Sequence, residues 1–263
     1  MENREVKRYI NDNKRYIPVG INIQNNDLAC LDMSNIFCFG IAGRFNTGKT
    51  NTLKIILSIL QIRGEECYVI DLDKTKQVFK NIVSTNNYLN SYEMIFNFFE
   101  ALLPQIKERN VFKKECIDKN YTDAKIYDEM NKKFSRINIF IDNVTEFIKI
   151  VYERHNLSAF LENIIDKGKL HNVYFFFGYD TDSFSEIAGR KLYNLFIDSN
   201  VLLHLGGNVA GQRVFDASSI NYTLQTKRFK NGIGLLRCFE EEDDTIFAND
   251  IKTFCVLIPK INL

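Results

Sequence analysis

Residues 39–50 of this sequence read Phe39-Gly40-Ile41-Ala42-Gly43-Arg44-Phe45-Asn46-Thr47-Gly48-Lys49-Thr50. From Gly43 to Thr50 it reads G-x-x-x-x-G-K-T, the Walker A pattern of a phosphate-binding loop. Glycines permit a tight turn whose backbone N–H groups point at phosphate oxygens, and the following helix presents the positive end of its dipole. In this pattern Lys49 reaches the β- and γ-phosphates and the Thr50 hydroxyl ligates Mg²⁺. We therefore expect a nucleoside triphosphate to be bound by Gly43, Arg44, Phe45, Asn46, Thr47, Gly48, Lys49, Thr50 and Asn51.

The segments on both sides of this loop agree with that interpretation. Residues Ile36 to Ile41 form a continuous apolar run, as expected for a buried central strand. After the loop, apolar residues recur at helical spacing from Leu53 to Leu60, and Gly64 is a plausible end signal. A strand, a glycine-rich loop and a helix in this order is the arrangement in which the motif binds phosphate.

A metal-binding carboxylate is expected at the end of another buried strand. Residues Arg136 to Asn143 form a largely apolar run with Asp142 near its end, the Walker B pattern, whose carboxylate holds Mg²⁺ through water or Thr50. A catalytic glutamate often follows that aspartate, but here the residue is Asn143, and an amide cannot act as a general base. Glu146 is a second candidate base, although it is expected on the next helix. The candidate catalytic residues are Asp142 and Glu146, the candidate metal ligands are Thr50 and Asp142, and the sequence supports nucleotide binding more strongly than turnover.

Two further strands end in polar residues where an α/β sheet places its ligands. Glu66 to Asp73 is an apolar run ending in acids, which could contact Mg²⁺ or water or could be a solvated strand end. Val173 to Tyr179 is followed by Asp180 to Ser183, the position of a γ-phosphate sensor or of an ordinary loop. His204, inside an apolar strand, is interpreted as a core histidine rather than a ligand.

The composition is that of an ordinary globular domain. The chain has 263 residues, of which 45% are apolar and 25% charged, and a net charge of +1, which argues against a strongly basic nucleic-acid surface. Its six cysteines form no C-x-x-C pair, so reduced core thiols are expected rather than a zinc site or disulfides. No apolar run approaches the roughly 20 residues of a membrane-spanning helix.

We predict an N-terminal extension over residues 1–16 and a single domain over residues 17–263. The predicted fold is α/β, a RecA-like P-loop NTPase with a mainly parallel central sheet flanked by helices. A β-hairpin made by Ile17–Ile23 and Leu28–Met33 precedes the nucleotide core. Helices are expected at Tyr92–Leu103 and Ile148–Lys167, whereas Lys107–Tyr127 is largely polar and receives no assignment.

Segments spread over nearly the whole chain also carry a resemblance to a known family. They are Ile17–Ile21, Gly48–Asn51, Leu205–Asn208 with Gln212 and Arg213, and Gln225–Lys227 followed by Gly232-x-Gly234. Together they resemble FtsK/SpoIIIE-type ATPase domains, and they are most similar to the C-terminal ATPase domains of the EssC/EccC proteins of type VII secretion systems. The Gly-Gly-Asn and Gln-Arg segment is more specific than the loop itself.

The resemblance implies an ATP-binding, cytoplasmic module of a longer, membrane-anchored motor with several ATPase modules in series. Such motors export small helical-hairpin effectors of the WXG100 class, and the last module helps to recognise the substrate. The implied partners are other ATPase modules of the same chain, these effectors and a homo-oligomer, a hexameric ring in the full protein. Distal modules of the family commonly bind ATP with impaired hydrolysis, which agrees with Asn143.

Two alternatives remain open. The first is an FtsK-like DNA translocase, which needs basic loops lining a pore; the candidates are scattered, at Lys113-Lys114, Lys132-Lys133 and Lys227-Arg228, and a nucleic-acid partner is not expected. The second is a non-catalytic module that binds an effector helix in an apolar groove and keeps a vestigial nucleotide site.

Overall fold

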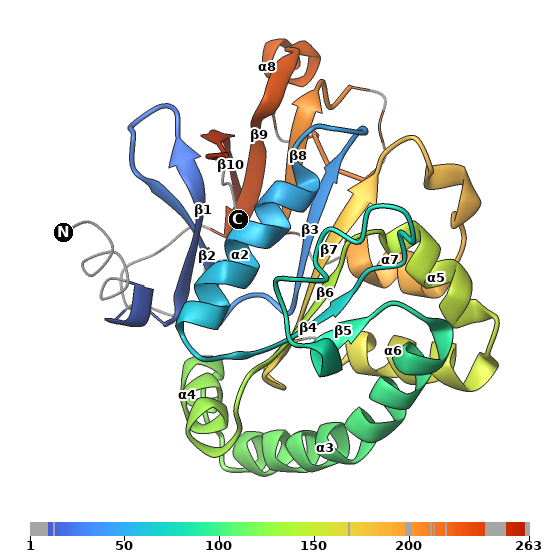
Figure 1. Ribbon diagram of the computed structural model, residues 1–263. Helices are drawn as coiled ribbons and strands as arrows, with labels where there is room; N and C mark the ends of the chain where they lie inside the picture. The colour runs from blue at the N-terminus through green and yellow to red at the C-terminus, as the bar shows by residue number, and fades with distance from the viewer. Residues whose placement is uncertain are drawn as a thin grey trace.

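A ten-stranded mixed sheet forms the centre of the computed structural model, which describes residues 10–12, 14–167, 169–197, 201–210, 212, 214–218, 220–239 and 251–260 (Figure 1). Arg213 and most of the N-terminal extension predicted over residues 1–16 lie outside these described ranges. The strands are β1 (Tyr16–Asn22), β2 (Leu28–Asp32), β3 (Cys38–Gly43), β4 (Glu66–Ile70), β5 (Tyr88–Leu89), β6 (Ile137–Ile141), β7 (Val173–Asp180), β8 (Leu202–Gly207), β9 (Phe229–Phe239) and β10 (Ile251–Leu257). The helices are α2 (Lys49–Ile62), α3 (Tyr92–Asp118), α4 (Asp123–Lys133), α5 (Val144–Tyr152), α6 (His155–Asp166), α7 (Lys191–Ile197) and α8 (Tyr222–Thr226), with short 3-10 helices at Thr85–Asn87 and Phe184–Glu186.

The sheet has a parallel half and an antiparallel half, in the order β2-β1-β10-β9-β8-β3-β7-β6-β4-β5. From β8 to β5 every neighbouring pair is parallel, and from β8 to β2 every pair is antiparallel. The predicted N-terminal hairpin is confirmed as the β1–β2 pair, and it lies at the outer edge of the antiparallel half. The phosphate-loop strand β3 lies between β7 and β8, near the middle of the sheet.

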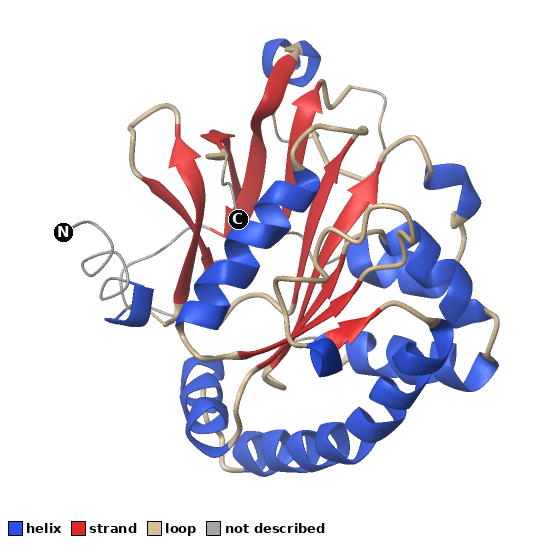
Figure 2. Cartoon of the chain, in the orientation of Figure 1, coloured by secondary structure: helices blue, strands red, loops and turns tan. Residues whose placement is uncertain are grey.

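Helices cover both faces of the parallel half (Figure 2). The strands β6 and β7 are largely apolar, apart from the buried Asn138 and the terminal Asp180, as expected for strands with both faces buried. Ile56 and Leu60 of α2 belong to the apolar cluster on one face, and Phe147 of α5 and Phe196 of α7 to the cluster on the other. The predicted α/β, RecA-like fold with a mainly parallel sheet is therefore confirmed.

Two helix predictions were wrong in extent. The helix expected at Ile148–Lys167 is divided into α5 and α6 by a break at Glu153 and Arg154, so that the apolar stripes of both helices reach the same cluster. The polar segment after Leu103 continues α3 to Asp118, because one buried stripe suffices to hold a helix whose other faces are solvated.

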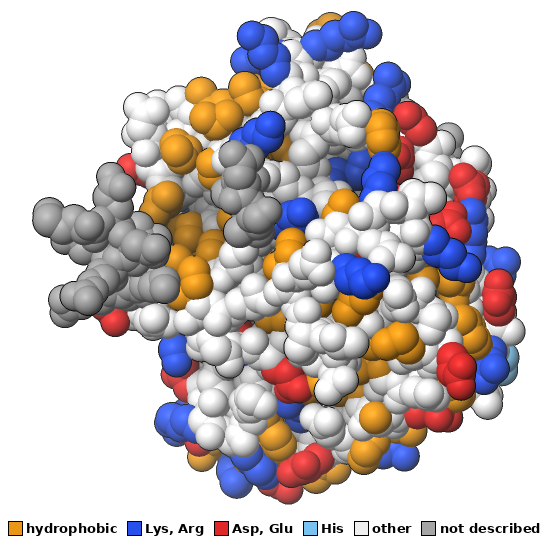
Figure 3. Space-filling view, in the orientation of Figure 1, with side chains coloured by type: hydrophobic (Ala, Val, Ile, Leu, Met, Phe, Trp, Pro, Cys, Tyr) orange, Lys and Arg blue, Asp and Glu red, His pale blue; other side chains and the backbone are white. Residues whose placement is uncertain are grey.

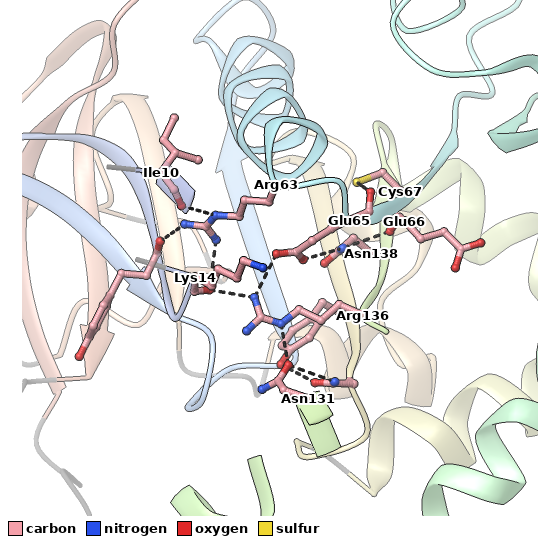
Figure 4. A network of polar contacts seen from close by, with 12 residues as sticks. Ile10, Lys14, Arg63, Glu65, Glu66, Cys67, Asn131, Arg136 and Asn138 are labelled. Carbon is pink, nitrogen blue, oxygen red and sulfur yellow. Dashed lines mark hydrogen bonds and ion pairs between the residues drawn. The ribbon is translucent and has the colours of Figure 1, made fainter. Parts of the chain in front are cut away.

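A polar network anchors the chain entering the domain at the end of α2 that lies away from the phosphate loop (Figure 4). The buried guanidinium of Arg63 donates to the carbonyl oxygens of Ile10 (2.9 Å), Lys14 (3.2 Å) and Tyr16. Arg136 donates to the Lys14 carbonyl at 2.8 Å and to Glu65 at 3.1 Å. The helix α2 therefore contacts the phosphate loop at one end and the N-terminal segment at the other.

Candidate nucleotide-binding site

The loop between β3 and α2 has the backbone that its glycines permit. Gly48 has a φ of 112°, a left-handed conformation that favours glycine, and it is the N-cap of α2. A Cβ on Gly43 would lie 2.5 Å from both the Leu205 carbonyl oxygen and Thr47 Oγ1. Gly48 is thus required for its conformation, whereas Gly43, whose φ is 156°, is required for close packing as well.

Lys49 spans the loop from the first turn of α2. Its ammonium donates to the carbonyl oxygens of Gly43 (2.8 Å) and Arg44 (2.7 Å), and Thr47 Oγ1 donates to the same Arg44 oxygen at 2.9 Å. These bonds hold the loop in its curved form and use two of the three lysine donors. Burial lowers the pKa of Lys49, and the carboxylates of Asp180, Asp142 and Asp182 oppose that shift.

Thr50 and Asp142 meet at the start of α2. Thr50 Oγ1 donates to Asp142 Oδ1 at 2.9 Å, and Asp142 directly follows β6. Burial raises the pKa of Asp142, while the Thr50 hydrogen bond opposes the shift. The described residues contain no group of three or more His, Cys, Asp or Glu side chains arranged to hold a metal. A hydroxyl, one carboxylate and substrate phosphates are the ligand set that Mg²⁺ commonly takes, so these residues fit Mg²⁺ bound with a nucleotide.

A pocket of about 650 Å³ opens beside the loop and brings most of the predicted site residues together. Gly43 and Arg44 do not line it, and their carbonyl groups accept hydrogen bonds from Lys49. The lining residues are Phe45, Asn46, Thr47, Gly48, Lys49, Thr50, Asn51, Leu72, Asp73, Lys76, Val78, Asp142, Asn143, Glu146, Gly178 and Asp180.

Asn143 has a structural contact as the N-cap of α5. Its Oδ1 accepts hydrogen bonds from the backbone N–H groups of Thr145 (3.1 Å) and Glu146 (3.2 Å). Glu146 lies in the first turn of α5, lines the pocket and forms a 2.8 Å ion pair with Lys149. Its place on the helix is the expected one, and its role as a base stays a prediction.

The carboxylates that follow β4 differ in their surroundings. Asp71 is buried and accepts a 3.1 Å hydrogen bond from the Tyr88 hydroxyl, which indicates a structural role. Asp73 lines the pocket and accepts from the Thr75 backbone N–H at 2.9 Å. Hydrogen bonds from Thr75 lower the pKa of Asp73.

Asp73 was expected near the site, but the sequence did not identify its neighbours Leu72, Lys76 and Val78 as a wall of the pocket. Lys76 places its ammonium 4.4 Å from the centre of the Phe45 ring, and Phe45 is 65% exposed at the tip of the loop. No motif marks this segment; only its position after a strand that ends in acids pointed to the site.

On its other side the loop contacts the C-terminal part of the chain. The Gly232 N–H donates to the Thr47 carbonyl at 3.0 Å. Asn51 Nδ2 donates to the Pro259 carbonyl at 2.9 Å, so this predicted ligand-binding side chain also ties the segment after β10 to α2. Residues far apart in the sequence therefore support the loop from both sides.

Comparisons with known proteins were made by sequence and by structure. No protein-family model and no curated protein matches the sequence. The cytoplasmic domain of EssC superposes with a TM-score of 0.68 at 15% identity, over 94% of this chain and 44% of that one. The chain has the fold of the EssC and EccC ATPases.

Two further solved structures share this fold. ATPases 2 and 3 of Thermomonospora curvata EccC, in complex with a signal sequence peptide, match at a TM-score of 0.65 and 12% identity, over 95% of this chain and 41% of that one. The pCW3 conjugation coupling protein TcpA, in its monomer form with ATPγS, superposes with a TM-score of 0.63 at 17% identity, over 95% of this chain and 68% of that one. The chain thus spans less than half the length of the EssC and EccC structures. No helix in the described ranges is long and apolar enough to cross a membrane.

Proposed function

We propose that this protein is an ATP-binding module of a type VII secretion motor that hydrolyses ATP weakly or not at all. The observation that carries the proposal is the contact between Thr50 Oγ1 and Asp142 Oδ1 beside Lys49, within one pocket. Loop N–H groups, a lysine, a hydroxyl and a carboxylate in this arrangement are what a nucleoside triphosphate with Mg²⁺ requires.

Each residue has a distinct role in this proposal. The backbone from Arg44 to Gly48 binds the phosphates, and Lys49 neutralises them. Thr50 would ligate Mg²⁺, and Asp142 would hold the ion directly or through water. Mg²⁺ neutralises phosphate charge when it is bound.

The proposal of slow turnover rests on Asn143. A residue that caps α5 through its amide oxygen has no proton-accepting group for an attacking water. Glu146, the other candidate base, is already paired with Lys149. Nucleotide binding would then stabilise the domain or an interface between modules rather than power movement.

We propose that the module is a cytoplasmic part of a longer, membrane-anchored chain that assembles into a ring. Within that chain the module would contact other ATPase modules and help to recognise WXG100-type effectors. The EssC and EccC structures that share the fold are more than twice as long as the part matched by this chain, which supports a multi-module arrangement. The signal sequence peptide bound to the EccC structure supports an effector-recognition role.

The Lys49→Ala variant tests the nucleotide site. Isothermal titration calorimetry with ATP and Mg²⁺ is expected to show binding to the native chain and at least roughly tenfold weaker binding to the variant, since a charge-assisted phosphate contact is lost. Lys54→Ala is the matched control, because Lys54 lies on the same helix, contacts the Phe79 ring and does not line the pocket. Unchanged ATP binding by Lys49→Ala would refute the site.

The same variant separates the alternatives. If ATP does not bind the native chain, and a WXG100-type effector still binds Lys49→Ala, the effector-binding module would be favoured. A salt-sensitive DNA gel shift would favour the translocase. On the face seen in Figure 3, acidic and basic side chains are scattered among apolar and uncharged atoms, which does not favour a DNA track.

A further inference from the structure

The side chain of Asp180 occupies a position next to the phosphate loop that the proposed function leaves unexplained. It is the last residue of β7, and in the parallel pairing with β3 it lies opposite Gly43, the first glycine of the motif. The Thr181 N–H donates to the Gly43 carbonyl at 3.3 Å, which fixes the strand end against the loop. Asp180 also lines the pocket.

The two oxygens of this carboxylate face different groups. Oδ1 accepts a 3.0 Å hydrogen bond from the Asp182 backbone N–H, which closes a tight turn. Oδ2 lies 3.9 Å from Lys49 Nζ. The turn therefore sets the orientation of the side chain, and the carboxylate is directed at the lysine that a terminal phosphate would contact.

The charges around the pocket show why this contact matters. Among the described lining residues, two carry ammonium groups, Lys49 and Lys76, and four carry carboxylates, Asp73, Asp142, Glu146 and Asp180. Three of the carboxylates have other partners: Asp73 has Thr75 and Lys76, Glu146 has Lys149, and Asp142 has Thr50. The ammonium within ion-pair distance of Asp180 is Lys49 itself.

Given the nucleotide site proposed above, we infer that Asp180 sets the preference of this site between nucleoside triphosphates and diphosphates. Its carboxylate neutralises Lys49 when no γ-phosphate is present and repels a γ-phosphate that approaches the same ammonium. A diphosphate ends at its β-phosphate, which the N–H groups of the loop also bind, so it meets less of this repulsion than a triphosphate does. Asp180 is thus a specificity-determining residue that weakens triphosphate binding relative to diphosphate binding.

The test compares affinities for ADP and for a non-hydrolysable ATP analogue, both with Mg²⁺, in the native chain, Asp180→Asn and Asp182→Asn. The Asp180→Asn variant keeps an oxygen that can accept the Asp182 N–H and removes only the charge. Like charges that face the same ammonium at a partly exposed site repel each other, so we expect the analogue to bind roughly tenfold tighter and ADP to change by less than about threefold. Asp182 pairs with Arg44 at 3.5 Å and acts on Lys49 more weakly than Asp180 does, so its variant is expected to change the ratio by less than Asp180→Asn.

The outcomes distinguish this inference from the function on which it rests. If no nucleotide binds the native chain or either variant, the proposed function fails. If nucleotides bind but Asp180→Asn leaves the ratio unchanged, the inference alone is overturned. If Asp180→Asn loses the residual phosphate release while the ratio of the two affinities stays unchanged, the inference is overturned as well. Asp180 would then act as a proton acceptor. Should Asp180→Asn fail to fold, Asp180→Ser retains an acceptor for the turn and the same ratio is measured.

Discussion

The hydroxyl of Thr50 lies 2.9 Å from a carboxylate oxygen of Asp142, a residue 92 positions further along the chain. Two parallel strands, β3 and β6, place their carboxyl ends on the same edge of the sheet on either side of β7, and this brings the two residues together. A hydroxyl and a carboxylate at this edge are suited to Mg²⁺.

The Asp142→Asn variant is expected to lose the Mg²⁺ dependence of nucleotide binding, with roughly tenfold weaker affinity, because a charged metal contact is removed. Titrations with ATP in Mg²⁺ and in EDTA measure this. The ligand-free variant is expected to unfold at a higher temperature, since burial raises the pKa of Asp142 and so disfavours its charged form. An affinity that still depends on Mg²⁺ to the native extent would contradict the assignment.

Gly43→Ala is expected to destabilise the domain by about 2 kcal/mol, because the added Cβ would meet the Leu205 carbonyl oxygen and Thr47 Oγ1 at 2.5 Å. Urea denaturation measures the change. Gly64→Ala is the control: its φ is 69°, but a Cβ there would meet no atom within 4 Å, so only the conformational cost of about 1 kcal/mol applies. An equal loss in both variants would exclude the close packing of Gly43 as the cause.

His204 is expected to make stability depend on pH. The side chain is buried in β8, and burial, helped by the charge of Lys49, lowers its pKa from 6.5 to about 4. The unfolded chain binds this proton more readily than the folded chain does. The free energy of unfolding is therefore highest above pH 6.5 and falls by about 3 kcal/mol as the pH drops to 4. Denaturation at several pH values should show a shallower decline in His204→Gln, while the exposed His155→Gln behaves like the native chain.

Arg63→Met is expected to loosen the N-terminal segment. The variant loses the hydrogen bonds to the carbonyl groups of Ile10, Lys14 and Tyr16, at a cost of about 3 kcal/mol. Hydrogen exchange should rise in residues 14–16, which lead into β1. Arg15→Gln, which removes a half-exposed ion pair with Asp32, should cost less than about 1 kcal/mol. Equal protection in Arg63→Met and the native chain would show that the anchor contributes little.

Much of the fold follows from local sequence. The buried parallel strands are largely apolar runs, and the glycines and lysine of the phosphate loop have a fixed order, so the core strands and the loop could be predicted. The extent of α3 could not, because Arg109 is held in the helix by the carbonyl groups of His171 and Ser135, which are distant in sequence.

The site was predictable only in part for the same reason. Lys49, Thr50 and Asp142 belong to motifs, and the structure brings them together. The orientation of Asp180 toward Lys49 and the contact of Lys76 with Phe45 depend on turns whose geometry no residue pattern specifies. The helix cap formed by Asn143 was partly predictable, since an asparagine directly before a helix often caps it.

Calorimetric titration of the native chain with ATP, in Mg²⁺ and in EDTA, with phosphate release followed in the same sample, shows whether the loop binds the nucleotide without turnover. Saturable binding that needs Mg²⁺ is expected, with little or no phosphate released. The absence of saturable binding in either condition would contradict the proposed nucleotide site. Binding followed by rapid phosphate release would retain the site and refute the proposed weak hydrolysis.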